Sequence, residues 1–101
     1  MKTLNQTVDE ALAVQMLRAL GNPIRFRIVQ LLAARDMCVT GELVDELPLA
    51  QSTVSSHLKV LKDAGIIEGT VEGPNTCYCL CQAAVAQLTG ILAAIGRGGC
   101  R

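Results

Sequence analysis

Aromatic side chains are almost absent from this chain, whose 101 residues include no Trp, one Phe (Phe26) and one Tyr (Tyr78). Half of the residues are nevertheless apolar, so the core has to be built from aliphatic side chains. Only 18% of the residues are charged, which together with the apolar half indicates a globular chain rather than a disordered one. The length is that of one domain, and we expect residues 1–101 to form a single unit.

Long apolar runs are also absent, and no stretch approaches the roughly 18 residues that cross a bilayer. No apolar segment of the signal-peptide type follows the N-terminus. We therefore expect a cytoplasmic protein without a membrane partner.

Net charge is missing as well, because nine basic side chains balance nine acidic ones. A broadly basic surface is therefore excluded, and any affinity for nucleic acid has to come from the local placement of cations. The chain has a single histidine (His57), no base–nucleophile pair and no glycine loop that could cradle a phosphate. These absences argue against an enzyme and against an organic cofactor.

Apolar periodicity and turn residues divide the chain into helices and a hairpin. The predicted elements are helices over Thr7–Leu20, Pro23–Ala34, Gly41–Leu47 and Gln51–Ala64, strands over Ile66–Val71 and Thr76–Cys81, and a helix over Ala83–Ile95. We expect residues 1–6 to form an N-terminal arm and the glycine-rich residues 96–101 to form a flexible tail.

Local signals mark the ends of several elements. Asn22 followed by Pro23 is typical of a helix start, and Thr40 is a candidate cap for the short third helix. Gly65 stands where a left-handed residue commonly ends a helix, and Glu72-Gly73-Pro74-Asn75 is a strong turn signal.

A short helix, a tight turn and an amphipathic helix with a polar outer side, followed by a hairpin, indicate a winged helix-turn-helix. Three blocks carry a more specific likeness: Ala19–Ile28 (ALGNPIRFRI), Gln51–Leu61 (QSTVSSHLKVL) and Ala64–Ile67 (AGII). The chain resembles the ArsR/SmtB family of winged-helix repressors over about residues 8–95. The resemblance implies a mainly α fold with a β-hairpin wing, in the order α-α-α-α-β-β-α.

The resemblance also implies a repressor that binds operator DNA as a homodimer. The first and last helices carry apolar stripes that are available for pairing with a second copy. These stripes are Val8, Leu12, Met16 and Leu20 in the first helix, and Val85, Leu88, Leu92 and Ile95 in the last, with Ile91 beside them.

The helix over Gln51–Ala64 is the candidate recognition helix, because its apolar positions Val54, Leu58 and Leu61 share one face. Amide and hydroxyl groups at the start of such a helix can meet base edges and phosphates. The predicted DNA-binding residues are Gln51, Ser52, Thr53, Ser55, Ser56, His57 and Lys59, with Lys62 and Arg25 as contacts to the DNA backbone. The resemblance places His57 beside this surface rather than in a metal site. The alternative is an ordinary solvated polar face.

Two departures from the family pattern reduce the expected affinity for DNA. Many relatives have a serine at the position of Ala50, where it would cap the recognition helix, and losing such a cap costs about 1 kcal/mol. The wing usually carries a basic residue beside its glycine, whereas this chain has Glu72, which phosphate repels.

The five cysteines are the most unusual feature of the composition. An odd number without an export signal argues against a disulfide framework and favours soft-metal binding or oxidant sensing. Cys77, Cys79 and Cys81 alternate with other residues, so a strand would place all three thiols on one face. Cys38 or Cys100 could complete a three-sulfur site. Alternatively, the cysteines are only small hydrophobic side chains.

The sensor motifs of the family fit this sequence poorly. The arsenic-type motif has two cysteines in the third helix, whereas this chain has only Cys38 near it, and the last helix lacks the Asp, His and Glu of the zinc-type site. A site made of cysteine sulfurs elsewhere in the chain remains as the candidate sensor. We expect an arsenite-like metalloid to bind Cys77, Cys79 and Cys38, with Cys81 and Cys100 as weaker candidates.

Two other functions stay open. The cysteines could form a disulfide or a persulfide, which would make the protein a redox or sulfide sensor on the same fold. The neutral charge also fits a winged-helix module that binds proteins instead of DNA.

Overall fold

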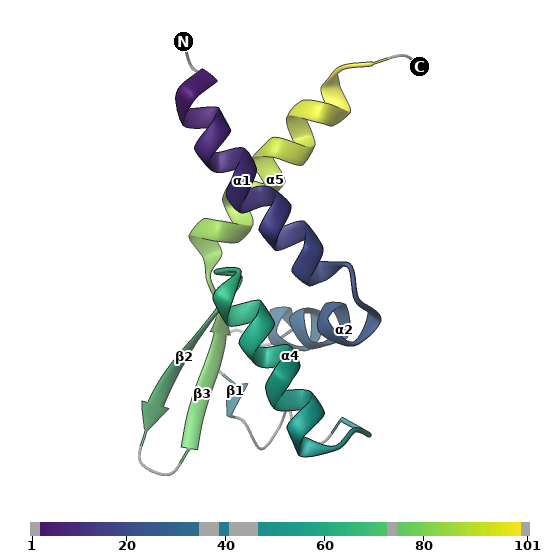
Figure 1. Ribbon diagram of the computed structural model, residues 1–101, viewed down its shortest axis with the longest axis vertical. Coiled ribbons are helices and arrows are strands. Elements are labelled where there is room, and N and C mark those ends of the chain that lie inside the picture. Colours follow the sequence, from purple (N-terminus) through teal and green to yellow (C-terminus); the bar gives the residue numbers. More distant parts are fainter. Residues whose placement is uncertain (1–2, 35–38, 41–46, 73–74, 100–101) are drawn as a thin grey trace.

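The structure is a computed structural model that describes residues 3–34, 39–40, 47–72 and 75–99. Its elements are α1 (Thr3–Leu20), α2 (Pro23–Ala33), β1 (Val39–Thr40), α4 (Gln51–Asp63), β2 (Ile67–Glu72), β3 (Asn75–Leu80) and α5 (Gln82–Arg97). Figure 1 shows α1 and α5 crossing at one end of the molecule and the β2–β3 hairpin at the other. The mainly helical winged helix-turn-helix fold is confirmed, and we call the β2–β3 hairpin the wing.

The structure differs from the predicted elements in several places. Helix α1 begins at Thr3 instead of Thr7, and α5 extends to Arg97 instead of Ile95. The helix predicted over Gly41–Leu47 falls on residues 41–46, outside the described residues, while Leu47 is in a bend ahead of α4. Thr40, the expected cap of that helix, lies in a two-residue strand that periodicity did not predict.

The predicted ends of α2 and α4 are confirmed in atomic detail. The Asn22 side chain accepts hydrogen bonds from the backbone N–H groups of Ile24 (2.9 Å) and Arg25 (3.1 Å), so it caps α2 ahead of Pro23. At the end of α4, Gly65 has a φ of 82°, and the next amide donates to the Leu61 carbonyl at 3.1 Å. This left-handed closure turns the chain directly into β2.

The strands form one antiparallel sheet in the order β1-β3-β2. Tyr78 of β3 pairs with Gly69 of β2 and with Val39 of β1. The side chains of Tyr78 and Leu80 pack against the hydrophobic core. Because successive side chains of a strand point to opposite faces, Cys77 and Cys79 lie on the sheet face that points away from this core.

The core lies where α1, α2, α4, β2 and α5 meet. Its buried residues are Ala13, Met16, Ala19, Ile28, Leu32, Val54, Leu58, Leu61, Ala64, Ile66, Ile67 and Leu88. Only part of the stripe predicted for α1 is buried, because Met16 is in the core whereas Leu12 is exposed. The other buried residues of α1 are Ala13 and Ala19. Their small side chains allow other elements to approach α1 closely.

The predicted lack of a membrane-spanning helix can be checked for the described part of the chain. There, no helix combines the length and the apolar character that are needed to cross a bilayer.

Candidate nucleic-acid interface and thiol face

Helix α4 buries one face and exposes the other, as its sequence predicts. Val54, Leu58 and Leu61 are in the core. Of the predicted DNA-binding residues on this helix, Thr53 and His57 are half-buried, and the exposed ones are Gln51, Ser52, Ser55, Ser56, Lys59 and Lys62. The helix therefore presents hydroxyl, amide and ammonium groups to solvent. At its C-terminal end α4 leads into β2 of the wing (Figure 1).

Two contacts reduce the hydrogen-bonding capacity of this polar face. The Ser56 hydroxyl donates to the Ser52 carbonyl at 3.0 Å, and Lys59 Nζ forms an ion pair with Asp63 Oδ2 at 3.1 Å. Both partners of the ion pair are largely exposed, with 76% and 64% of their side-chain surfaces accessible, so the pair contributes little to stability. A phosphate can therefore displace Asp63 from Lys59 at small cost.

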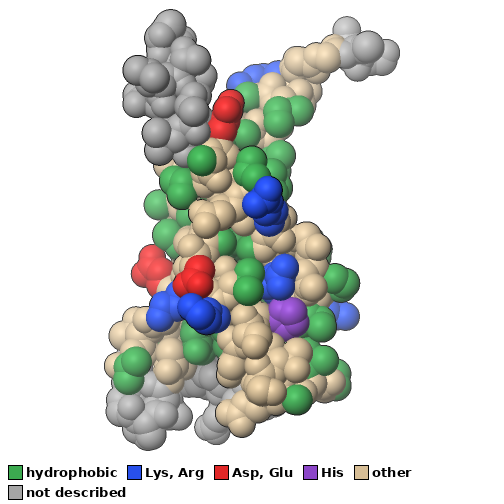
Figure 2. All heavy atoms as spheres, in the orientation of Figure 1, with side chains coloured by type: hydrophobic (Ala, Val, Ile, Leu, Met, Phe, Trp, Pro, Cys, Tyr) green, Lys and Arg blue, Asp and Glu red, His purple; other side chains and the backbone are tan. Residues whose placement is uncertain are grey.

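Arg25 and His57 form a contact that sequence reasoning missed. Arg25 Nε donates to the Ala19 carbonyl at 2.7 Å, and Arg25 Nη1 lies 3.2 Å from His57 Nδ1. Because a guanidinium can only donate, His57 Nδ1 accepts in this contact. The pair joins α2 to α4 across 32 positions of sequence and orients the histidine beside the polar face (Figure 2). Part of the Arg25 donor set is thus already used within the protein.

The start of α4 lacks the side-chain cap that α2 has. Ala50 has the extended backbone of an N-cap residue (φ −62°, ψ 144°), but its side chain has no acceptor. A serine at this position should accept a hydrogen bond from one of the first free amides of the helix. The sequence-based expectation of an uncapped helix agrees with this geometry.

We expect Ala50→Ser to raise the free energy of unfolding by about 1 kcal/mol, measured by urea denaturation. Ala50→Val is the matched control, because it enlarges an exposed side chain without adding an acceptor. Equal stability of the two variants would show that the hydroxyl does not cap the helix.

The five cysteines separate into three groups in the structure. Cys77 and Cys79, which we call the thiol pair, are half-buried in β3 at alternate positions. Cys81 lies one residue beyond the strand as the N-cap residue of α5, where its backbone is still extended (φ −84°, ψ 98°) and its amide donates to the Ile66 carbonyl at 2.8 Å. Cys38 and Cys100 lie outside the described residues. Among the residues that are described, no group of three or more His, Cys, Asp or Glu side chains is arranged to hold a metal ion.

Comparisons with known proteins identify the fold that carries these features. Residues 22–68, from the cap of α2 into β2, match the model of a family described as "Bacterial regulatory protein, arsR family". A crystal structure described as a possible transcriptional regulator for arsenical resistance is 30% identical, with a TM-score of 0.68, over 80% of this chain and 82% of that one. The chain belongs to the arsR family.

Two further proteins are similar to this arsR-family chain. It is 40% identical over 87 residues to the HTH-type transcriptional repressor SmtB of Mycobacterium tuberculosis, covering 86% of this chain. The chain spans 62% of the length of that relative. A homodimeric winged helix-turn-helix DNA-binding domain from Mycobacterium bovis, 24% identical, shares the fold with a TM-score of 0.66 over 94% of this chain and 84% of that domain. The expectation that the chain is not an enzyme agrees with a family of regulatory proteins.

The arsR-family chain also exposes large apolar side chains on its two crossing helices. On α1 these are Leu12, Val14 and Leu17, and on α5 they are Leu92 and Ile95. The stripe predicted for α5 is buried at Leu88 and becomes exposed toward the C-terminus, where α5 diverges from α1 (Figure 1). An apolar stripe that continues beyond its own core is typical of a surface that another molecule covers.

Proposed function

We propose that this arsR-family chain is a transcriptional repressor that binds operator DNA as a homodimer, with α4 as the recognition helix. The observation that carries the proposal is the exposed polar face of α4, directly ahead of the wing in the chain and within the residues that match the family. Gln51, Ser52, Thr53, Ser55 and Ser56 are the candidates for contacts to bases and phosphates. Lys59, Lys62 and the remaining Arg25 donors contact the DNA backbone, and His57 orients Arg25.

Dimerisation compensates in part for the absence of net positive charge in one copy. One copy of a domain this size covers one half-site, and two copies related by a twofold axis present two recognition helices and double the number of cations. The exposed apolar side chains of α1 and α5 support pairing through these helices. The homodimeric domain from Mycobacterium bovis, which shares the fold, supports the same assembly.

DNA binding is tested with a fragment of the promoter that precedes the coding sequence, in about 100 mM salt, by fluorescence anisotropy. A repressor should prefer this fragment to a scrambled one and should lose affinity steeply as salt rises. Equal binding of both fragments, or none, would favour the winged-helix module that binds proteins.

We further propose that a trivalent metalloid, arsenite or antimonite, releases the operator by binding thiolates. The thiol pair, Cys77 and Cys79, supplies two sulfurs on one face of the sheet, and soft ions prefer sulfur ligands. Cys38 is the third candidate, because it adjoins Val39, which pairs with Tyr78 between the two cysteines of the pair. Cys81 and Cys100 are weaker candidates. The likeness to a possible regulator for arsenical resistance supports arsenite as the first ion to test.

Arsenite should weaken operator binding of the reduced wild-type protein by about 5–150-fold, the usual range of allosteric coupling. Each As–S bond forms as one thiol proton and one hydroxide of arsenous acid leave as water. Cys79→Ser should abolish the effect, whereas Cys81→Ser should keep it, because Cys81 lies outside the strand. The reductant should be a phosphine, which has no thiol to compete for arsenite.

The same titration separates metalloid sensing from redox sensing. Release by a disulfide-forming oxidant or a persulfide donor, with no response to arsenite, would replace the metalloid proposal by the redox one. Unchanged arsenite release from Cys79→Ser would show that the thiol pair is not the site.

A further inference from the structure

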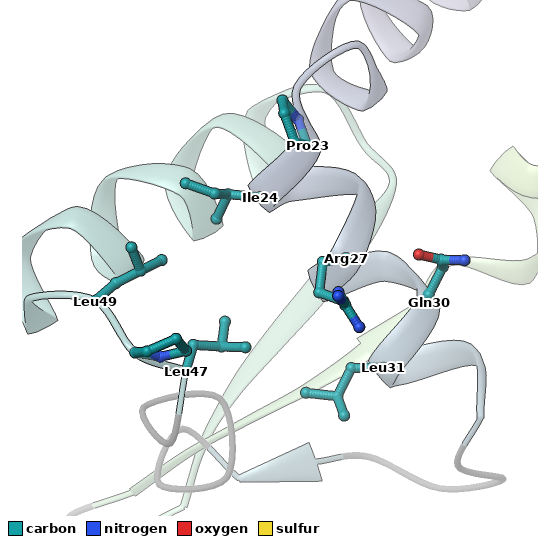
Figure 3. A pocket seen from close by; sticks show the side chains of 8 residues that line it. Pro23, Ile24, Arg27, Gln30, Leu31, Leu47 and Leu49 are labelled. Atoms are coloured by element: carbon teal, nitrogen blue, oxygen red, sulfur yellow. The ribbon is translucent and has the colours of Figure 1, made fainter.

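A pocket of about 740 Å³ lies beside α2, separate from the polar face of α4 and from the thiol pair. It opens between α2 and the segment Leu47–Leu49, which leads into α4 (Figure 3). Its volume is within the range of about 300–1,000 Å³ that is usual for small-molecule sites. None of the functions proposed above uses this pocket.

The lining of the pocket is mainly apolar, and its polar side chains are Arg27 and Gln30. Ile24 and Leu31 of α2 point toward the side on which Leu47 and Leu49 lie, and Arg27 stands between them (Figure 3). All four apolar side chains are half-buried and also pack against the core, so they form a wall attached to the fold. A ligand that covers this wall removes apolar surface from water, which favours binding.

Arg27 gives the pocket its charge. No hydrogen bond or ion pair of its guanidinium involves a described residue, in contrast to Arg25, which is held by Ala19 and His57. The described lining residues include no acidic side chain, so nothing among them neutralises this cation. Gln30, one turn along the same helix, adds an amide donor next to it. A guanidinium binds carboxylates and similar anions through two parallel hydrogen bonds.

We propose that this pocket binds an amphipathic organic anion, whose apolar part covers Ile24, Leu31, Leu47 and Leu49 while its carboxylate or similar group binds Arg27. Inorganic phosphate or a DNA phosphate fits less well, because neither would cover the apolar wall. A neutral hydrocarbon would leave the guanidinium without a partner.

The position of the pocket connects it to DNA binding, and this step rests on the proposed function. Leu49 is followed by Ala50, the N-cap residue of α4, so a ligand between α2 and Leu47–Leu49 contacts the segment that starts the recognition helix. A ligand that binds one arrangement of this segment more tightly than another would shift the population toward that arrangement. The bound anion should therefore change operator affinity.

The direct test uses decanoate as the probe, with amide chemical shifts measured by ¹H–¹⁵N NMR. Saturable shifts should centre on α2 and on residues 47–49, and decyltrimethylammonium and decanol, which share the alkyl chain, should bind much more weakly. Equal binding of the cationic compound, shifts centred elsewhere, or no binding up to millimolar concentration would overturn the proposal.

Arg27→Gln tests how much the charge of Arg27, as distinct from the apolar wall, contributes to decanoate binding. Loss of the charged hydrogen bonds should weaken decanoate binding by about tenfold or more. Arg18→Gln is the matched control, because Arg18 is also exposed but lies on α1 and is not part of the lining. Both substitutions are at the surface, so the fold should persist, and unchanged affinity of Arg27→Gln would exclude Arg27 as the anion site.

Operator binding with and without decanoate tests the regulatory step. A several-fold change in operator affinity on adding decanoate, seen in wild type but not in Arg27→Gln, would support the regulatory step. Unchanged operator affinity would refute this step but not the proposed binding site. A protein that binds decanoate but no operator DNA would refute the proposed repressor function and not the pocket.

Discussion

Replacing Ile95 by glutamate should convert a dimer of this chain into monomers and weaken operator binding by about 100-fold or more. Ile95 lies on the α5 stripe whose accessible fraction rises from 8% at Leu88 to 46% at Leu92 and 69% at Ile95. In a dimer that pairs these stripes, each subunit would have to bury one carboxylate, and burying an unpaired charge costs several kcal/mol. In a twofold-symmetric dimer this cost arises twice, which favours dissociation.

The measurement is the molar mass by light scattering after size exclusion, followed by anisotropy with operator DNA. Ala93→Glu is the matched control, since Ala93 is exposed about half a helical turn away, on the side of α5 opposite Ile95. Both variants place the same charge near the same helix end, so any effect on the helix dipole is shared. If Ile95→Glu remained a dimer, the proposed pairing through α5 would be wrong.

The start of α2, the end of α4 and the wing could be predicted from sequence because their signals are local. Asn22 and Pro23 mark the start of α2, Gly65 marks the end of α4, and a change of apolar period marks the hairpin. The alternation of Cys77 and Cys79 in a strand likewise predicted their common face. Cys81 is the last extended residue before α5 begins.

The features that were missed depend on partners distant in sequence. Strand β1 has two residues and forms only by pairing with β3, so no local period reveals it. The Arg25–His57 contact joins two helices whose relative placement the sequence does not give. The prediction for α1 favoured large side chains such as Leu12, whereas the packed face uses Ala13 and Ala19, where close approach matters more than apolar volume.

The second large effect concerns Ser52, which is exposed in the first turn of α4. The first turn of this helix contains no acidic residue, so Ser52→Glu should interact favourably with the helix dipole and raise the free energy of unfolding by about 0.3–1 kcal/mol. At a DNA interface the same carboxylate meets phosphate, and like charges brought together cost several kcal/mol. Operator affinity should therefore fall by about 100-fold or more while the protein becomes slightly more stable.

Opposite signs of the two effects make this prediction specific, because a folding defect cannot lower DNA affinity while raising stability. Urea denaturation gives the first quantity and anisotropy with operator DNA in fixed salt gives the second. Gln87→Glu introduces the same carboxylate at an exposed position of another helix, α5, and should alter operator affinity only by the small effect of overall charge. Similar losses in Ser52→Glu and Gln87→Glu would mean that total charge governs binding, and α4 would then lose its assignment as the recognition helix.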